Sequence, residues 1–486
     1  MTTEAADHPR QPACEGTGEP FVHSGTPAGR WVLAAAVLGS GMALLDGTVI
    51  NVALRSLGRD LDASVPQLQW VVNAYLLTLA ALILVAGALG DRFGRRRIFL
   101  IGVVWFGVAS LLCAVARTPE QLIVARLVQG VGGALLTPGS LSIIQGSFPP
   151  SERGAMIGQW AGLGGIAAAI GPPLGGWVVD VATWRWIFWF NVPVVVLIVV
   201  IGLRHVPESR DPTATRGHDA TGSVLAVLGL GGVTFALIEN ESAAAVPLGG
   251  LGIAALAAFV VVEHRTAHPV MPLHLFGSRV FSVANAMTLL VYGALAGVML
   301  FLVLQLQVIV GYTPLQAGLA TLPITAIMLA LSSRSGALSA RIGPRMQMSV
   351  GPLLAAVGTL LLVGVDAGSG YLTGVLPGML LFSLGLVALV APLTSSVMAA
   401  APDRFAGVAS GINNAVARTG SLLAVAALPA LVGLGGVDYE RPEVFGPGYV
   451  EAMVVCAVLL AAGGVISFFG LGGARPAGSR AAEQCR

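Results

Sequence analysis

The sequence predicts an all-α polytopic membrane protein, and its composition and its hydropathy pattern are the two observations that predict it. Of its 486 residues, 55% are hydrophobic and only 10% are charged. A soluble chain of this length needs far more charge to cover its surface. Apolar segments of about 20 residues, the length that crosses a bilayer as a helix, recur from one end of the chain to the other.

The apolar segments and the polar breaks between them predict about 14 membrane-spanning helices. In chain order they cover residues 31–54, 67–87, 98–117, 120–145, 154–179, 186–204, 221–239, 246–262, 280–306, 314–333, 346–366, 371–398, 405–434 and 449–472. An even number of crossings places both tails, residues 1–30 and 473–486, on one side. Arginine is concentrated in the tails and in the loops on that side, so the positive-inside rule makes it the cytoplasmic side.

Two short hairpins repeat the same residues, one in each half of the chain. The first, Gly87–Arg97, reads Gly-Ala-Leu-Gly-Asp-Arg-Phe-Gly-Arg-Arg-Arg. The second, Gly336–Arg345, repeats Gly-Ala-Leu and then Arg, Gly and Arg in the same register. The first follows the second predicted helix and its repeat follows the tenth. We therefore expect two six-helix bundles, residues 31–204 and 280–472, separated by residues 205–279, a linker with two inserted helices.

Three charged residues lie deep within predicted helices: Asp46, Arg126 and Arg418. Charges at this depth are costly in lipid, so we expect all three to face protein or water, in one layer of a central cavity. Burial disfavours a charged carboxylate and a nearby arginine favours it, so Asp46 is a candidate for proton exchange, with Arg126 as its partner. Simple structural pairing of Asp46 with Arg126 is the alternative. For Arg418, a structural polar cluster with Asn413 and Asn414 explains the sequence equally well.

Other polar residues within the predicted helices are candidates for lining a substrate cavity. They are Asn73, Tyr75, Gln159, Asn285, Tyr292, Gln305, Gln307, Asn413 and Asn414, together with Arg418. Most polar residues in membrane helices bond neighbouring helices to each other, so helix packing is the alternative for each. With Asp46 reserved for protons, such a cavity would suit a neutral, zwitterionic or weakly charged amphipathic compound.

Several classes of protein lack support in the sequence. The chain has no Gly-x-x-x-x-Gly-Lys phosphate loop, and its cysteines and histidines show no metal-ligand spacing, so no cofactor or metal is expected. The net charge of +2, without a basic cluster interleaved with aromatic residues, argues against nucleic acid as a partner. A membrane enzyme would require His or Asp clustered on one face, and a receptor would not explain a buried acid combined with a duplicated hairpin.

Four motifs occur in order at the expected helices and together resemble the major facilitator superfamily, in particular its 14-span drug–proton antiporter branch. Leu45–Leu54 resembles the first-helix motif, Gly87–Arg97 the signature loop, Arg126–Ala134 the fourth-helix motif and Gly171–Gly176 the fifth-helix antiporter motif. More loosely, residues 269–276 are similar to antibiotic self-resistance pumps such as the methylenomycin exporter. There are two departures: Arg55 stands where the first motif usually has proline, and Ala340 stands where the first hairpin has Asp91.

This resemblance implies the major facilitator fold and alternating access driven by the proton gradient. The expected protein is a monomer in a bacterial inner membrane that exchanges protons for small amphipathic compounds such as antibiotics, or for an endogenous metabolite. The signature loop would lock the two halves together on the cytoplasmic side through Gly87, Gly90, Asp91, Arg92, Gly94, Arg95 and Arg96. The fifth-helix motif, with Gly171, Pro172, Gly175 and Gly176, goes with export in this family.

Overall fold

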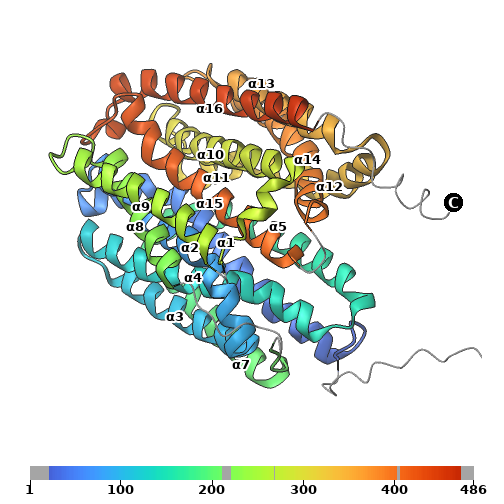
Figure 1. The fold of residues 1–486 in the computed structure, drawn as a ribbon. Coiled ribbons are helices and arrows are strands. Elements are labelled where there is room, and N and C mark those ends of the chain that lie inside the picture. Colours follow the sequence, from blue (N-terminus) through green and yellow to red (C-terminus); the bar gives the residue numbers. More distant parts are fainter. Residues whose placement is uncertain (1–20, 211–219, 267–268, 402–404, 472–486) are drawn as a thin grey trace, which may run out of the picture.

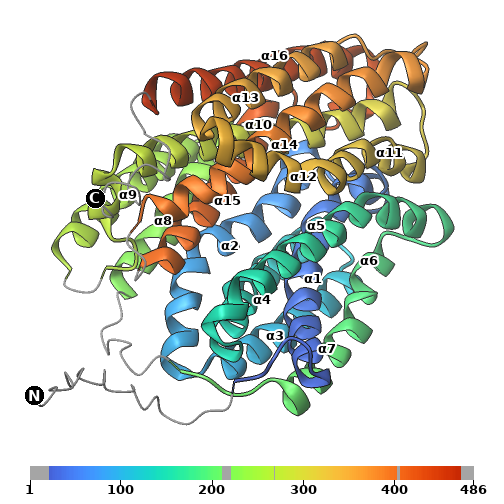
Figure 2. The same cartoon turned by 90° about the vertical axis from the view of Figure 1, so that its right-hand side faces the viewer.

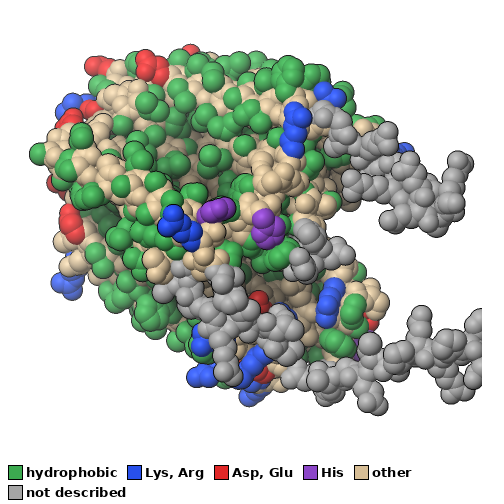
Figure 3. All heavy atoms as spheres, in the orientation of Figure 1, with side chains coloured by type: hydrophobic (Ala, Val, Ile, Leu, Met, Phe, Trp, Pro, Cys, Tyr) green, Lys and Arg blue, Asp and Glu red, His purple; other side chains and the backbone are tan. Residues whose placement is uncertain are grey.

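A computed structural model describes residues 21–210, 220–266, 269–401 and 405–471. Fourteen helices in this described part of the chain are long and apolar enough to cross a membrane. Each overlaps one of the predicted segments, so the predicted all-α membrane architecture is confirmed. Many large apolar side chains face outward, as expected for a surface in contact with lipid, and they cover much of the face seen in Figure 3.

The N-terminal half is formed by the first six crossings. Its helices are α1 (Pro27–Leu61), α2 (Val65–Phe93), α3 (Arg95–Val115), α4 (Pro119–Ser147), α5 (Pro150–Val181), α6 (Arg185–Trp189) and α7 (Asn191–His205). The short α6 and α7 together make the sixth crossing. Within this half α2 and α3 both pack on α4, and α1 packs on α5 (Figure 1).

The C-terminal half is formed by the last six crossings. Its helices are α10 (Arg279–Val308), α11 (Pro314–Ala320), α12 (Leu322–Ile342), α13 (Pro344–Leu362), α14 (Leu376–Ala399), α15 (Ala406–Leu431) and α16 (Pro442–Gly470), with single turns at Leu273–Gly277 (η1), Tyr371–Val375 (η2) and Asp438–Glu440 (η4). The α11–α12 crossing is interrupted at Thr321, just before Pro323, which lacks the N–H that would continue the helix.

Helices α8 (Ala220–Ile238) and α9 (Ala245–Arg265) form the inserted pair. They pack closely on each other, and α8 also contacts α2 of the N-terminal half and α15 of the C-terminal half. The pair therefore lies along the line where α2 and α15 meet (Figure 1). At the α8–α9 turn, the Glu239 carboxylate accepts a hydrogen bond from the Trp70 indole of α2 at 3.1 Å.

The two repeated hairpins turn in the same way. Gly94 links α2 to α3 with φ of +113°, and Gly343 links α12 to α13 with φ of +83°. Only glycine adopts this region without strain, which explains why both copies of the repeat carry it at this position. We call the end of the molecule that carries these turns the hairpin face, and the end that carries the α1–α2 and α15–α16 loops the opposite face.

The two halves touch near the opposite face and separate toward the hairpin face. On α5, a Cβ added at Gly176 would lie 2.4 Å from the Pro314 carbonyl oxygen of α11, whereas one added at Gly154, Gly158 or Gly165 would meet nothing within 4 Å. These glycines share one side of α5, so the same side is packed at one end and open at the other. Figure 2 shows the helices with the hairpin face toward the viewer, and Figure 3 shows a notch between the halves at that end.

Candidate functional site

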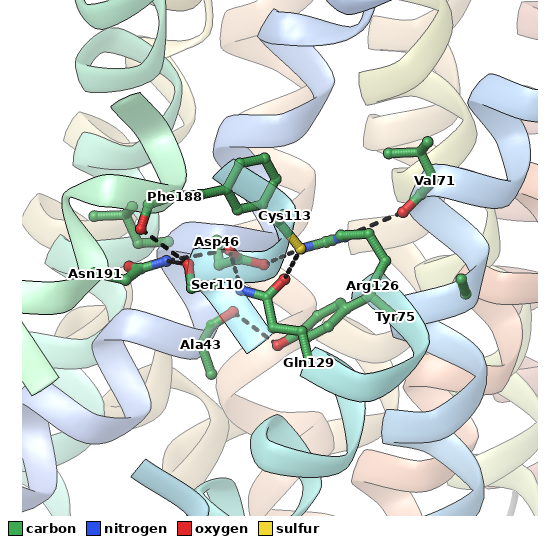
Figure 4. A network of polar contacts seen from close by, with 12 residues as sticks. Ala43, Asp46, Val71, Tyr75, Ser110, Cys113, Arg126, Gln129, Phe188 and Asn191 are labelled. Atoms are coloured by element: carbon green, nitrogen blue, oxygen red, sulfur yellow. Dashed lines mark hydrogen bonds and ion pairs between the residues drawn. The ribbon is translucent and has the colours of Figure 1, made fainter. Parts of the chain in front are cut away.

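Asp46 and Arg126 form an ion pair inside the N-terminal half (Figure 4). Asp46 lies on α1 and is 1% exposed, and Arg126 lies on α4 and is fully buried. Gln129, one turn further along α4, accepts a hydrogen bond from Arg126 Nη1 at 2.8 Å and donates one to Asp46 Oδ1 at 3.0 Å. Residues three apart in a helix share a face, so α4 presents both groups to the carboxylate together.

A second layer of polar groups joins α3, α6 and α7 to the pair. Asn191 Nδ2 lies 3.5 Å from Asp46 Oδ1 and donates to Ser110 Oγ at 2.9 Å. Ser110 donates in turn to the Phe188 carbonyl oxygen at 2.9 Å. The break between α6 and α7 places Phe188 and Asn191 here. We did not predict Gln129, Ser110 or Asn191 as site residues, although Gln129 belongs to the fourth-helix motif.

The remaining surface of Arg126 is covered by α2 and by aromatic rings. Its Nε donates to the Val71 carbonyl oxygen at 3.1 Å, and its guanidinium lies 4.5 Å from the centre of the Tyr75 ring and 5.9 Å from that of Phe188. The Tyr75 hydroxyl donates to the Ala43 carbonyl oxygen at 3.2 Å. Tyr75 is therefore part of this network, which corrects its prediction as a cavity residue.

This arrangement can couple a proton to conformation. A buried ion pair is favourable only while both charges are present, and removing one leaves a buried charge without compensation, at about 3–5 kcal/mol. Protonation of Asp46 would therefore weaken its hold on Arg126, and through Arg126 the contacts with Val71 and Tyr75 of α2. The network joins α1, α2, α4 and α7, so such a change would reach most of the half.

The expectation that Asp46, Arg126 and Arg418 share one cavity layer is wrong in part. Asp46 and Arg126 are enclosed within the N-terminal half, whereas Arg418 lies on α15 of the other half. Tyr75 is within electrostatic range of both Arg126 and Arg418. Asp46 and Arg126 therefore do not line the space between the halves.

Polar contacts close the opposite face between the halves. Gln307 of α10 donates to the Val52 carbonyl oxygen of α1 at 3.0 Å, and Arg55 of α1 donates to the Gln307 carbonyl oxygen. Arg55 is the residue that departs from the family's proline, and here its side chain crosses to the other half. Nearer the surface, Arg59 pairs with Glu440 at 3.0 Å.

A further contact between α2 and α15 supports the same closure. Gln69 Nε2 of α2 donates to the Val425 and Ala426 carbonyl oxygens of α15 at 2.8 and 2.9 Å. Both carbonyls lie in the last two turns of α15, toward the opposite face. The Gln69 side chain is buried, so water does not compete for these bonds.

The fifth-helix motif packs α5 against both halves. A Cβ at Gly171 would lie 2.2 Å from Thr48 Oγ1 of α1, and one at Gly175 would lie 2.5 Å from Val49 Cγ1. On the other side of α5, a Cβ added at Gly318 of α11 would lie 2.3 Å from the Pro172 carbonyl oxygen. This contact is close to the one that Gly176 makes with the same helix. The motif's glycines and its proline therefore lie where α5 joins α1 to the C-terminal half.

Among the residues that the structure describes, the hydrogen bonds and ion pairs of the signature hairpin go to its own half and to the segment after α7. Asp91 pairs with Arg95 at 2.9 Å. The main-chain N–H groups of Arg96 and Arg97 donate to the Glu208 carboxylate at 3.1 and 3.2 Å. Glu208 caps the first turn of α3, a role we did not predict. A Cβ added at Gly90 would meet nothing within 4 Å, and the Arg92 guanidinium lies over the Phe93 ring, so the predicted lock between the halves is not formed among the described residues.

Most predicted cavity residues lie between helices instead. Asn413 of α15 donates to Thr288 Oγ1 and Asn285 Oδ1 of α10 at 2.7 and 3.3 Å, and Gln305 donates to the Val365 carbonyl oxygen at 2.7 Å. Asn73 is fully buried, and with its amide suitably oriented it bonds the α15 main chain at Leu422 and Ala426. Gln307 closes the opposite face, as described above. The cavity assignment is corrected for these residues.

The predicted cavity residues without such a contact are Gln159, Tyr292, Asn414 and Arg418. Gln159 is exposed on α5, whereas Tyr292, Asn414 and Arg418 are half-buried. Tyr292 lies on α10, and Asn414 and Arg418 lie on α15. They remain the candidates for contact with a substrate.

Two halves of six membrane-spanning helices each, an inserted helix pair and a buried ion pair in one half define the class of an α-helical membrane transporter. Residues 36–425 match the Major Facilitator Superfamily. The chain is 33% identical over 448 residues to the tetracenomycin C resistance and export protein of Streptomyces glaucescens, covering 89% of this chain and 80% of that protein. It is 36% identical over 409 residues to the methylenomycin A resistance protein of Streptomyces coelicolor, covering 83% and 85%.

Solved structures show the same fold. A bacterial homologue of the human lysosomal transporter Spinster, in an inward-facing and unoccupied conformation, matches with a TM-score of 0.66 at 16% identity, covering 92% of this chain and 97% of that one. An auto-inhibited peptide transporter of the POT family matches with a TM-score of 0.67 at 13% identity, covering 91% and 97%. The chain therefore belongs to the Major Facilitator Superfamily and is a transporter, not an enzyme.

Proposed function

We propose that this protein exports small amphipathic compounds, such as antibiotics, in exchange for protons. The observation that supports the coupling most directly is the enclosed Asp46–Arg126 pair and its bonds to Gln129 and Asn191. It provides a single carboxylate whose protonation changes the contacts of several helices. Export of an organic compound is supported by the relatives named for resistance to tetracenomycin C and methylenomycin A, and by the Gly171–Gly176 motif.

Helix α1 connects the proton site to the contacts between the halves. Asp46 lies six residues, or about 9 Å of helix, before Val52, whose carbonyl oxygen accepts the Gln307 hydrogen bond. Arg55 and Arg59 follow on the same helix and hold the other half at the opposite face. A shift of α1 on protonation of Asp46 would therefore act directly on these contacts.

The proposed cycle has the steps that alternating access requires. With the hairpin face open, Asp46 is paired with Arg126 and the compound enters between the halves from the cytoplasm. The halves then rock, the opposite face opens, and the compound leaves. A proton from outside binds Asp46, the halves rock back, and the proton passes to the cytoplasm as the next compound enters.

The proposal includes the orientation of the protein in the membrane. The hairpin face, which carries Arg92, Arg95, Arg96 and Arg97, lies in the cytoplasm together with both termini, as the positive-inside rule predicts. The protein resides in a bacterial inner membrane and acts as a monomer, with the proton gradient as its energy source and no cofactor. In the outward-open state, the signature hairpin would close the hairpin face.

Reconstitution into vesicles that are acidic inside tests the proposal. Addition of candidate antibiotics should release lumenal protons, followed with an entrapped pH-sensitive dye, because each compound taken up is exchanged for protons. Asp46→Asn should abolish this release while the compound still binds. Glu451→Gln is the matched control, because Glu451 is an exposed carboxylate on α16. An Asp46→Asn protein that accumulates the compound at the full rate would overturn the coupling.

A further inference from the structure

Arg418 lies at the middle of α15 on the side that meets the N-terminal half. It is twelve residues after the first residue of the helix, Ala406, and thirteen before the last, Leu431. Gly411 and Val425, each seven residues away, share its side of the helix. A Cβ at Gly411 would lie 3.1 Å from Leu84 Cδ2 of α2, and the Val425 carbonyl oxygen accepts the hydrogen bond from Gln69 of α2. The Arg418 side chain therefore starts from the interface between the two halves.

The charge of Arg418 has no compensating partner among the described residues. In the part of the chain that the structure describes, its guanidinium forms no hydrogen bond or ion pair, and its Nε is shielded from solvent without a partner. The nearby carboxylate of Asp46 is already held by Arg126 and Gln129. A cation at mid-bilayer depth without a partner is costly, so a residue of this kind indicates a functional site.

The groups around Arg418 suit an organic anion. The hydroxyl group of Tyr292 lies within electrostatic range of its guanidinium, and Asn414 is one turn away on the same helix. A guanidinium presents paired N–H groups that match the two oxygens of a carboxylate. The Tyr292 phenol and the Asn414 amide, both half-buried, add donors and aromatic surface for the remainder of a bound molecule.

A small apolar cavity lies further along the interface, toward the opposite face. Its volume is about 40 Å³, and it is lined by α1, α2, α10, α15 and α16, with Leu54, Val72, Phe301 and Val425 among its walls. Val425 is seven residues, or about 10 Å of helix, from Arg418 on the same side of α15. The Arg418 guanidinium and the apolar cavity thus follow each other along the interface.

We propose that Arg418 binds the anionic group of the exported compound, and that the substrates are organic acids with an aromatic or otherwise apolar body. The carboxylate, or an ionised phenol, contacts the guanidinium, and the apolar body extends toward the cavity. This inference rests on the proposed export function and narrows its substrates from amphipathic compounds in general to acidic ones. Lipophilic cations are excluded by the same charge.

A matched pair of probes tests this assignment in the purified full-length protein. 2-Naphthoate and 2-naphthamide share one aromatic body and differ in charge. We expect the wild-type protein to bind the acid about tenfold or more tightly than the amide, the ratio typical of a charge-assisted hydrogen bond. Arg418→Gln should remove this preference and leave amide binding unchanged, and Arg418→Lys should retain part of it. Arg117→Gln, which removes an exposed arginine, is the control for loss of net charge.

The outcomes separate this inference from the proposed function. Equal binding of acid and amide by the wild type, or an acid preference that survives in Arg418→Gln, overturns the assignment. If Arg418→Gln weakens the binding of acid and amide equally, Arg418 has only a structural role, and the assignment is overturned as well. If neutral or cationic compounds still drive Asp46-dependent proton release, the export function stands without the inference. If no compound releases protons but the acid preference depends on Arg418, the anion site stands and the export function fails.

Discussion

Removing the charges of Asp46 and Arg126 singly and together should show whether the buried pair is one unit. Both side chains are almost completely buried, so water cannot compensate a charge that loses its partner. Asp46→Asn should reduce the free energy of unfolding by about 3–5 kcal/mol, toward the lower end because asparagine can still accept a bond from Gln129. Arg126→Gln should reduce the free energy of unfolding by a similar amount, because it leaves the Asp46 carboxylate buried without its partner.

The double variant Asp46→Asn/Arg126→Gln leaves no buried charge and should be more stable than either single variant. Because the double variant should lose less stability than either single variant, the interaction energy from this cycle should exceed about 3 kcal/mol, at or above the upper end of the values found for residues in contact. Unfolding by sodium dodecyl sulfate in mixed micelles measures it, and Glu451→Gln should change stability by less than about 0.5 kcal/mol. Losses that simply add in the double variant would refute the reasoning, and so would proton-coupled export by that variant.

Two further predictions concern the contacts that hold the present conformation, and a third concerns the cap of α3. Gly176→Ala places a Cβ 2.6 Å from Leu315 Cα, so α11 must move away from α5. Because this loosens the closure at the opposite face, a cysteine introduced at Leu54 should react faster with a thiol reagent applied from that face. Gln307→Leu removes one buried hydrogen bond to α1, worth about 1 kcal/mol, and should raise the same labelling rate about fivefold. Unchanged labelling in both variants would contradict the assigned closure. Glu208→Ala should speed amide hydrogen exchange in the first turn of α3, as expected when a helix loses its cap, and equal exchange rates would count against that role.

The fold was largely predictable from the sequence because the signals for it are local. Membrane helices follow from the length and hydropathy of each segment, and all 14 predicted segments correspond to helices. The repeated hairpin was recognisable because both copies need a glycine where the backbone takes positive φ, at Gly94 and Gly343. Asp46 and Arg126 were identifiable as important because a charge deep in an apolar segment is expensive and therefore rare.

Which way each polar side chain points was decided only by the tertiary structure. The helices are apolar on most of their surface, so their sequences do not say which side faces a neighbour, a cavity or lipid. Asn73 and Asn413 were candidates for a cavity by depth, yet both bond neighbouring helices. Arg418 was an equally good candidate by sequence, and at the interface of the halves its Nε has no hydrogen-bond partner among the described residues.

The sequence by itself thus determined the crossings, the duplication and the depth of the charged residues. Only the tertiary structure decided that Asp46 is enclosed in one half, that Arg55 reaches the other half, and that Glu208 caps α3. These contacts join residues between 80 and 252 positions apart or depend on how two halves rest on each other. The hydrophobicity of a segment contains no information about either, because it is set by the segment alone.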